Sequence, residues 1–261
     1  MQFSIRSAAR LAIFLAATSS AAAQDASPFQ RLVIDGHAVR WRPEVADRPL
    51  AVSYVVAEDE VIDPRAVNCR RIRSPDGLLQ RSNLPREAFD LALRRAFDRW
   101  QRVANIIFVA APRGTRAQIT VGEQVDPQGF AYTNLTLGSR TGGDPAEILA
   151  AGICLNPDQK WKVGFDGNLS VYDLEYALAH EIGHAIGLDH PGPRGHLMSF
   201  TYAETAPDLT EGDAAGAMAI YGPALRMTTT ARAMPTSEPA QVFDASTIKP
   251  VSRGLKRPPA D

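Results

Sequence analysis

Apolar residues recur with helical spacing between positions 86 and 103. They are Phe89, Leu93, Ala96, Phe97 and Trp100, at i, i+4, i+7, i+8 and i+11. Because these positions fall on one face of an α-helix, the pattern predicts an amphipathic helix over residues 86–103. We interpret its aromatic side chains as part of a hydrophobic core, not as a binding surface.

Four other segments are predicted to be β-strands. Residues 50–56, 106–110 and 117–121 are rich in β-branched and aromatic side chains, which favours extended structure. Residues 147–155 are the fourth predicted strand. The stretch before residue 147 is rich in Gly, Thr and Asn, so we expect a long surface loop there.

Two more helices are predicted in the second half of the chain. Residues 173–186 form the first, with Asp173 placed to cap its N-terminus. Residues 211–220 form the second, where Thr210 and Asp213 have the spacing of a capping box. No internal repeat interrupts this order, and we expect a single globular domain.

The two ends of the chain differ from the rest. Residues 1–23 carry two arginines, a short apolar run and three alanines before Gln24, which indicates a signal peptide. An N-terminal membrane anchor is the alternative, although the apolar run is shorter than the roughly 20 residues that a spanning helix needs. We expect a short extension at residues 24–49 and, because residues 224–261 are rich in Pro and lack an apolar period, a disordered tail.

Composition limits the partners. The chain has 261 residues, 45% hydrophobic content and a net charge of −1, so nothing in its charge favours nucleic acid or an anionic membrane. We expect a monomer that is secreted, either extracellular or periplasmic. Cys69 and Cys154 are the two cysteines; after export they should form a disulfide, and the alternative is a free thiol that binds a metal.

Three of the five histidines lie within one short segment, residues 180–190. His180 and His184 are four residues apart, so on a helix both rings can face one ion. A continuing helix would turn His190 roughly 240° away at 100° per residue. The helix must therefore end before His190, and Gly187 stands where a left-handed residue could end it.

Three imidazole ligands are typical of a catalytic zinc site. They leave one tetrahedral position for water, whereas a structural zinc is closed by a fourth protein ligand. Glu181 is offset around the helix from His180 and can act as general base on that water. The alternative, an amphipathic helix with incidental histidines, accounts for neither Gly187 nor His190.

The segment from His180 to His190 resembles the metzincin metalloproteases, in which a Met-turn follows the third histidine. Residues 195–200 supply such a turn, with Met198 eight residues after His190. In that family the methionine packs beneath the site and does not bind zinc, so the resemblance implies a structural role for Met198.

Within the metzincins the chain looks most like a matrixin catalytic domain. Residues 97–109, 153–161 and 209–222 resemble segments of that domain in the same order, and the resemblance covers residues 50–222. It implies an α+β zincin fold over residues 50–223: a twisted mixed sheet of about five strands with three helices, the catalytic helix being followed by the Met-turn. His190-Pro191-Gly192 is closer to the serralysin branch.

The chain departs from the matrixin pattern at several positions. Cys154 stands where a ligand of the family's structural zinc is found, so we expect one catalytic Zn²⁺ and no structural zinc. Asn156 and Gln159 replace carboxylates that bind Ca²⁺, and amides are weaker calcium ligands. Phe200 stands where astacins and serralysins have a tyrosine ligand, and we do not expect nearby Tyr202 to bind the metal.

The resemblance implies a polypeptide substrate. An extended peptide would pair with an edge strand, for which residues 147–155 are the candidate, and residues 199–207 would wall a pocket that Phe200 makes apolar. We therefore expect a secreted zinc metalloendopeptidase acting on extracellular proteins. The alternatives are a non-catalytic secreted binding module and a narrow-specificity processing protease that acts on its own tail.

Overall fold

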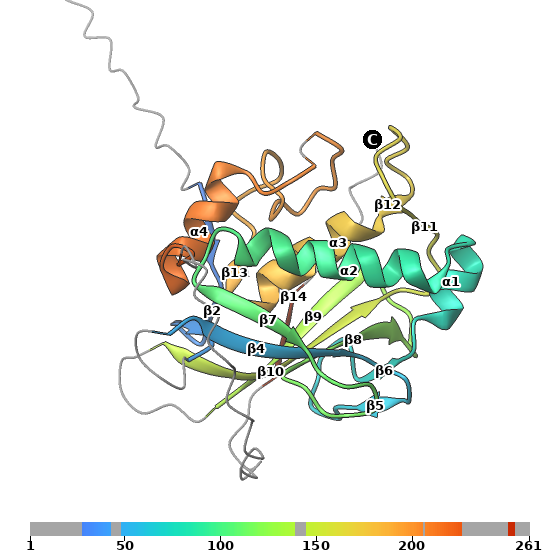
Figure 1. Ribbon diagram of the computed structural model, residues 1–261, viewed down its shortest axis with the longest axis horizontal. Coiled ribbons are helices and arrows are strands. Elements are labelled where there is room, and N and C mark those ends of the chain that lie inside the picture. The colour runs from blue at the N-terminus through green and yellow to red at the C-terminus, as the bar shows by residue number, and fades with distance from the viewer. Residues whose placement is uncertain (1–27, 43–47, 139–144, 206, 226–249, 254–261) are drawn as a thin grey trace, which may run out of the picture.

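A computed structural model describes residues 28–42, 48–138, 145–205, 207–225 and 250–253. Its centre is a sheet in which five strands follow the order β9–β10–β8–β4–β7 (Figure 1). These strands are β4 (Leu50–Val56), β7 (Ile106–Ala110), β8 (Ile119–Gln124), β9 (Ala131–Leu137) and β10 (Ala146–Leu155). All neighbours pair in parallel except β9 and β10, which are antiparallel.

Short strands extend this sheet. On its margins lie β2 (Val33–Ile34), β3 (His37–Arg40), β5 (Val61–Ile62), β6 (Arg71–Arg73) and β14 (Pro250–Arg253). Two separate pairs are β1 (Gln30–Arg31) with β13 (Leu188–Asp189), and β11 (Trp161–Lys162) with β12 (Tyr172–Asp173).

The helices of the described residues are α1 (Asp76–Ser82), α2 (Arg86–Gln101), α3 (Leu174–Ala185) and α4 (Glu211–Tyr221). In Figure 1 α2 and α3 lie on the same side of the sheet, and Trp100 of α2 donates its indole N–H to the Ala179 carbonyl of α3 at 2.8 Å. This bond satisfies the polar atom of a buried aromatic side chain and fixes the spacing of the two helices.

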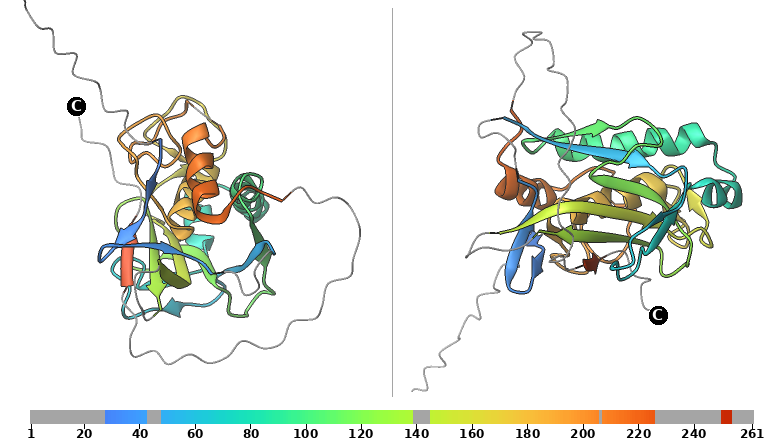
Figure 2. Two further views of the ribbon diagram at one scale, coloured as in Figure 1. Left: turned by 90° about the vertical axis from the view of Figure 1, so that its left-hand side faces the viewer. Right: turned by 90° about the horizontal axis from the view of Figure 1, so that it is seen from below.

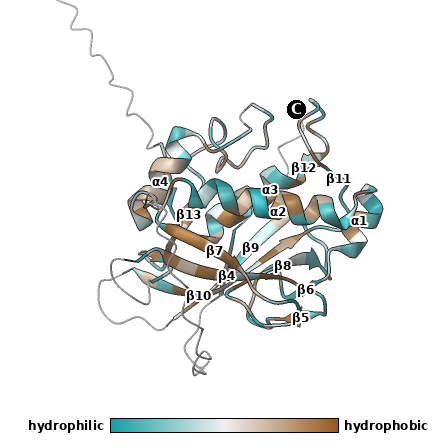
Figure 3. Ribbon diagram, viewed as in Figure 1, coloured by the Kyte–Doolittle hydropathy of each residue, from teal (hydrophilic) through white to brown (hydrophobic). Residues whose placement is uncertain are grey.

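The core lies between these helices and the sheet. The predicted stripe of α2 is buried there, with Phe89, Ala96 and Trp100 fully enclosed. Hydrophobic residues also dominate β4, β7 and β10 (Figure 3).

A disulfide joins Cys69 to Cys154 of β10, with the two Cα atoms 5.9 Å apart. Together with Ala57 and Ile72 these cysteines form a small second cluster, against which Tyr132 of β9 packs. The bond therefore ties the loop before β6 to the part of the sheet that carries β9 and β10. Among the described residues, no helix is long and apolar enough to span a bilayer.

The α+β fold expected from the sequence is confirmed, with additions. The described residues contain a fourth helix, α1, and β9 occupies part of the stretch expected to be a loop. Thr133 and Asn134 are polar yet buried, and for that reason the alternation of a half-buried strand is hidden in β9.

The edge strand was wrongly predicted. Residues 147–155 belong to β10, which pairs on one side with β8 and on the other with β9, so it is interior and β9 is the outer strand of the central five. Residues 250–253, within the segment expected to be disordered, form β14 on β9. The rest of that segment beyond residue 225, and the expected signal peptide, lie outside the described residues.

Candidate metal centre

The helix that carries the motif begins where the sequence places a cap. The Asp173 carboxylate accepts a hydrogen bond from the Tyr176 N–H at 2.7 Å. Helix α3 ends at Ala185, and Gly187 follows with φ +93°. A Cβ at Gly187 would collide with the Val39 carbonyl oxygen; only glycine satisfies both the left-handed backbone and this close approach.

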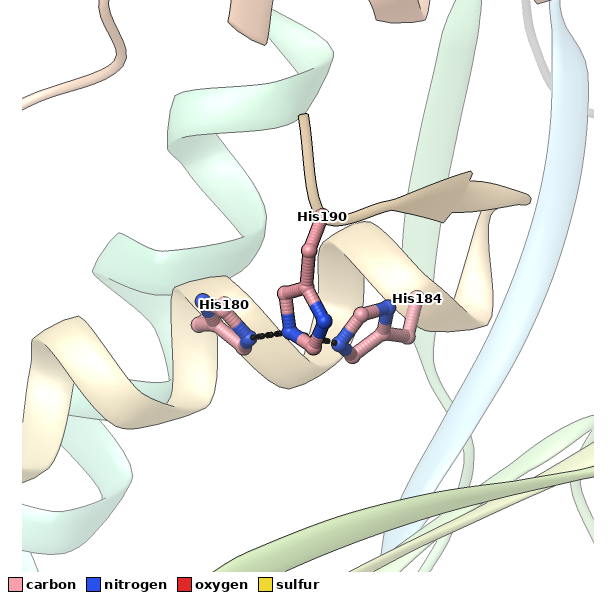
Figure 4. Close-up of side chains that lie close together, drawn as sticks. All are labelled: His180, His184 and His190. Carbon is pink, nitrogen blue, oxygen red and sulfur yellow. Dashed lines mark hydrogen bonds between the residues drawn. The ribbon is translucent and has the colours of Figure 1, made fainter. Parts of the chain in front are cut away.

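The turn at Gly187 brings the third histidine back over the helix. His180 and His184 project from α3, and His190 follows β13 (Figure 4). The Nε2 atom of His190 lies 3.0 Å from that of His180 and 3.2 Å from that of His184. His180 and His184 are completely buried. The three residues predicted to bind one ion thus converge on a common point.

Backbone carbonyls fix the state of two rings. His180 Nδ1 lies 2.7 Å from the Leu197 carbonyl oxygen, and His184 Nδ1 lies 2.8 Å from that of Leu188. A carbonyl can only accept, so each Nδ1 must carry the hydrogen and each Nε2 must present a lone pair. This second interaction orients a metal-binding imidazole and sets its tautomer.

The donor set fits zinc. Zn–N bonds of about 2.0–2.1 Å in a tetrahedron place ligand nitrogens about 3.3 Å apart, close to the 3.0 and 3.2 Å separations observed. A proton on His190 Nε2 could serve only one of the two facing lone pairs. One divalent cation at the centre would satisfy all three nitrogens.

Burial keeps the two helix-borne rings neutral. It lowers the pKa of His180 to about 3, with a further decrease from the neighbouring His190, against which the hydrogen bond to Leu197 acts. The pKa of His184 is also far below its ordinary value, first through burial and then through His180 and His190. Neutral imidazole is the form that binds a metal, so these rings are prepared to do so near neutral pH.

A residue of the sheet holds the side chain of Glu181 in place. The Glu181 side chain is buried, and its Oε2 accepts a hydrogen bond at 2.8 Å from Thr133 of β9; the same hydroxyl lies 2.9 Å from the Glu181 carbonyl oxygen. Thr133 therefore joins β9 to the residue predicted as general base. The motif gives no sign of Thr133, because its importance depends on a strand 48 residues away.

The Met-turn is fixed by a buried acid. Asp213 of α4 accepts hydrogen bonds from the backbone N–H groups of Leu197, at 2.8 Å, and Met198, at 3.1 Å. The sequence identified Asp213 only as half of a capping box, which it also forms with Thr210. It therefore holds in place the carbonyl of Leu197 that orients His180.

Met198 packs beneath the helix, where Gly183 gives it room. A Cβ on Gly183 would come within 2.9 Å of the Met198 methyl carbon and of Trp100 Cζ2. The glycine inside the His-Glu-x-x-His segment is thus a packing requirement. Met198 is almost completely buried.

Three other residues discussed from the sequence have clear surroundings. The Tyr202 hydroxyl accepts from the Asp173 N–H at 2.9 Å and donates to Glu204 at 2.7 Å, so it serves the start of α3. His196 Nδ1 lies 2.8 Å from the Thr210 hydroxyl. Phe200 is 39% exposed with its ring 6.1 Å from that of His190, where it can contact a bound molecule.

The fold and the three-histidine centre define a metzincin-type metalloprotease scaffold. The family model described as matrixin matches residues 78–222, more than half of the chain. The chain belongs to the matrixin family, whose members are zinc metalloproteases that act on polypeptides.

Individual relatives agree with this assignment. The chain is 32% identical over 152 residues to an interstitial collagenase of Equus caballus, which covers 54% of this chain and 30% of that protein. It is also 32% identical over 167 residues to matrix metalloproteinase-16 of Homo sapiens (56% of this chain and 26% of that protein), and 27% identical over 182 residues to stromelysin-2 of Rattus norvegicus (64% and 37%). The matched part spans about a third of the length of these relatives.

Proposed function

We propose that this protein is a secreted zinc-dependent metalloendopeptidase that hydrolyses peptide bonds in extracellular proteins. The observation that carries the proposal is the convergence of His180, His184 and His190, with the buried carboxylate of the adjacent Glu181 hydrogen-bonded to Thr133 of β9. A purely structural metal site has no need of that carboxylate.

The roles of the residues follow from this geometry. A zinc ion held by the three imidazoles would supply Lewis-acid chemistry, making a water more acidic and polarising the peptide carbonyl. Glu181 takes the proton from the attacking water and passes it to the leaving amine. Thr133 keeps the Glu181 carboxylate from rotating away, and Met198 and Asp213 support the ligand-bearing segments.

The substrate that fits best is an extended polypeptide. A peptide can pair with a strand through main-chain hydrogen bonds, and β9, at one end of the five central strands, is the strand that also touches Glu181. Phe200 beside His190 favours an apolar residue in the neighbouring pocket. The side-chain oxygen of Asn156 accepts from the Asp158 N–H at 2.7 Å, and this use within its own turn supports a weak or absent calcium site.

The proposed organisation of the chain follows the same reasoning. Residues 1–23 serve as the signal peptide, residues 24–49 as an N-terminal extension, and residues 50–223 as the catalytic domain. Residues 28–40 include strands that pair with β10 and β13, so this extension contributes directly to the domain. Residues 224–261 form a C-terminal tail.

A single assay tests the activity. The full chain, loaded with zinc, should cleave casein or members of a random peptide library, and a chelator should abolish cleavage. Glu181→Ala should lower kcat by roughly 10²–10⁴-fold, the usual contribution of a general base. Glu147→Ala, which removes an exposed carboxylate 3.9 Å from Arg42, is the matched control and should retain activity. Cleavage that survives both Glu181→Ala and chelation, or no cleavage of any substrate, would refute the proposal.

A further inference from the structure

The outer side of β9 is not open in this protein. Strand β14 (Pro250–Arg253) pairs with it in antiparallel register, Pro250 opposite Thr136 and Arg253 opposite Thr133 (Figure 1; red in Figure 2). An exposed strand edge is a template on which another extended segment adds. Here the chain's own C-terminal part takes that place.

The register brings β14 to the candidate metal centre. Its last residue, Arg253, pairs with Thr133, and Thr133 is the residue that hydrogen-bonds to Glu181. Strand β14 therefore runs along β9 towards the catalytic carboxylate. A peptide substrate bound to the same edge would have to occupy the same main-chain groups.

The side chain at the end of β14 also has a partner. The Arg253 guanidinium Nε lies 3.7 Å from Oδ2 of Asp189, whose side chain is 17% exposed. The other oxygen of Asp189 accepts the N–H of His190 at 2.9 Å, and so the carboxylate is fixed next to a predicted ligand. In any segment that pairs with β9, the side chain opposite Thr133 therefore faces the negative charge of Asp189.

We propose that residues 250–253 are an internal pseudosubstrate: β14 fills the peptide-binding edge of β9, and Asp189 forms a subsite for a basic side chain, occupied in cis by Arg253. The inference rests on the proposed function, because it treats β9 as the place where substrates bind. Peptides with Arg or Lys at the matching position compete with β14 for the edge. Because β14 belongs to the same chain as β9, its effective concentration at β9 is high. Release of β14 therefore increases the access of other peptides to the site.

Hydrogen exchange tests the occupancy without any catalysis. All proteins carry Glu181→Ala, which keeps the chain intact, and exchange is followed at residues 131–137. The double change Val251→Pro and Ser252→Pro removes main-chain donors of β14 and should raise exchange in β9 at least tenfold. Arg253→Glu should raise it several-fold, whereas Arg253→Lys should leave it within twofold of the parent. Equal exchange in the parent and the proline variant overturns the proposal.

A binding measurement tests the competition and the subsite. The probe is a labelled synthetic peptide with the sequence of residues 247–255. It should bind the proline variant at least tenfold more tightly than the parent, and a copy of the peptide with Glu in place of Arg should bind several-fold more weakly. Equal affinity for the parent and the proline variant refutes a pseudosubstrate, and equal affinity of the two peptides refutes the basic subsite. Neither readout depends on peptide hydrolysis, so failure of the proposed activity would be recognised separately.

Discussion

The proposed metal-binding half of the site and its proposed peptide-binding half are built in different ways. The three histidines lie within residues 180–190, on one helix and the turn that follows it. The peptide-binding half joins Thr133 of β9, Asp189 and β14, which are far apart in the sequence. Local spacing therefore determines the metal site, whereas long-range strand pairing determines what the site can accept.

Loss of one of the three histidines should have the largest effect, on zinc binding. His184→Ala leaves two imidazoles for the ion, and zinc affinity should fall by more than the roughly 10–100-fold typical of losing an outer-shell partner. Elemental analysis and peptide cleavage measured together would show both losses. His37→Ala, which removes a histidine of β3, is the matched control and should keep one zinc per chain. Full zinc content in His184→Ala would contradict the assignment.

Removal of the disulfide should affect the peptide-binding half and leave the metal-binding half intact. The disulfide spans 85 residues, and replacing both Cys69 and Cys154 with Ser should lower the free energy of unfolding by about 4–5 kcal/mol, as expected for a long closed loop. Because Tyr132 of β9 packs against this cluster, exchange in β9 should also rise. Denaturant unfolding measures the first effect. Zinc content should stay at one per chain, and its loss would show that the halves are not independent.

Acid should weaken the metal-binding half in the chelator-treated protein. His180 binds a proton near its ordinary pKa of 6.5 when unfolded but only at about 3 when folded. Between these values the unfolded state holds more protons, so stability falls as the pH decreases. The slope is about 1.4 kcal/mol per pH unit for each such histidine.

Urea unfolding at several pH values between 7.5 and 4.5 measures this slope. His180→Gln removes one of the two strongly shifted groups and should give a smaller decrease. Stability that stays constant down to pH 4.5 in the unsubstituted, metal-free protein would show that the rings are not held neutral by burial.

Loss of the hydrogen bond between Thr133 and Glu181, which connects the two halves, should have the smallest effect. Thr133→Val keeps the side-chain shape but removes the hydroxyl that donates to Glu181, and a lost hydrogen bond to a charged group predicts a decrease of roughly tenfold in kcat. Thr133→Ser should restore most of the activity. The control is Thr136→Val in the same strand. An unchanged kcat in Thr133→Val would show that Thr133 does not position the Glu181 carboxylate for catalysis.

The sequence predicted the regular, local parts of the fold well. β4 and β7 match the expected ranges, and α2, α3 and α4 differ from them by at most two residues at either end. Each has a strong local signal: an apolar stripe in α2, a cap at Asp173 in α3, and the Thr210–Asp213 capping box in α4.

The parts that could not be predicted depend on distant contacts. β9 buries two consecutive polar residues, Thr133 against Glu181 of α3 and Asn134 against Asn68, so its period does not identify a strand. Because residues 131–137 were expected to be a loop, residues 147–155 were predicted to be the edge strand. β14 lies in a Pro-rich segment without apolar periodicity and is recognised only through its pairing with β9.

The most direct test of the central claim is the X-ray absorption spectrum of zinc bound to the full chain. One zinc per chain is expected, with three imidazole nitrogens at about 2.0–2.1 Å and one further light atom from solvent. Substitution of His190 should reduce the imidazole contribution. A sulfur ligand, a fourth imidazole, or the absence of zinc from freshly isolated protein would contradict the claim that His180, His184 and His190 form an open catalytic site.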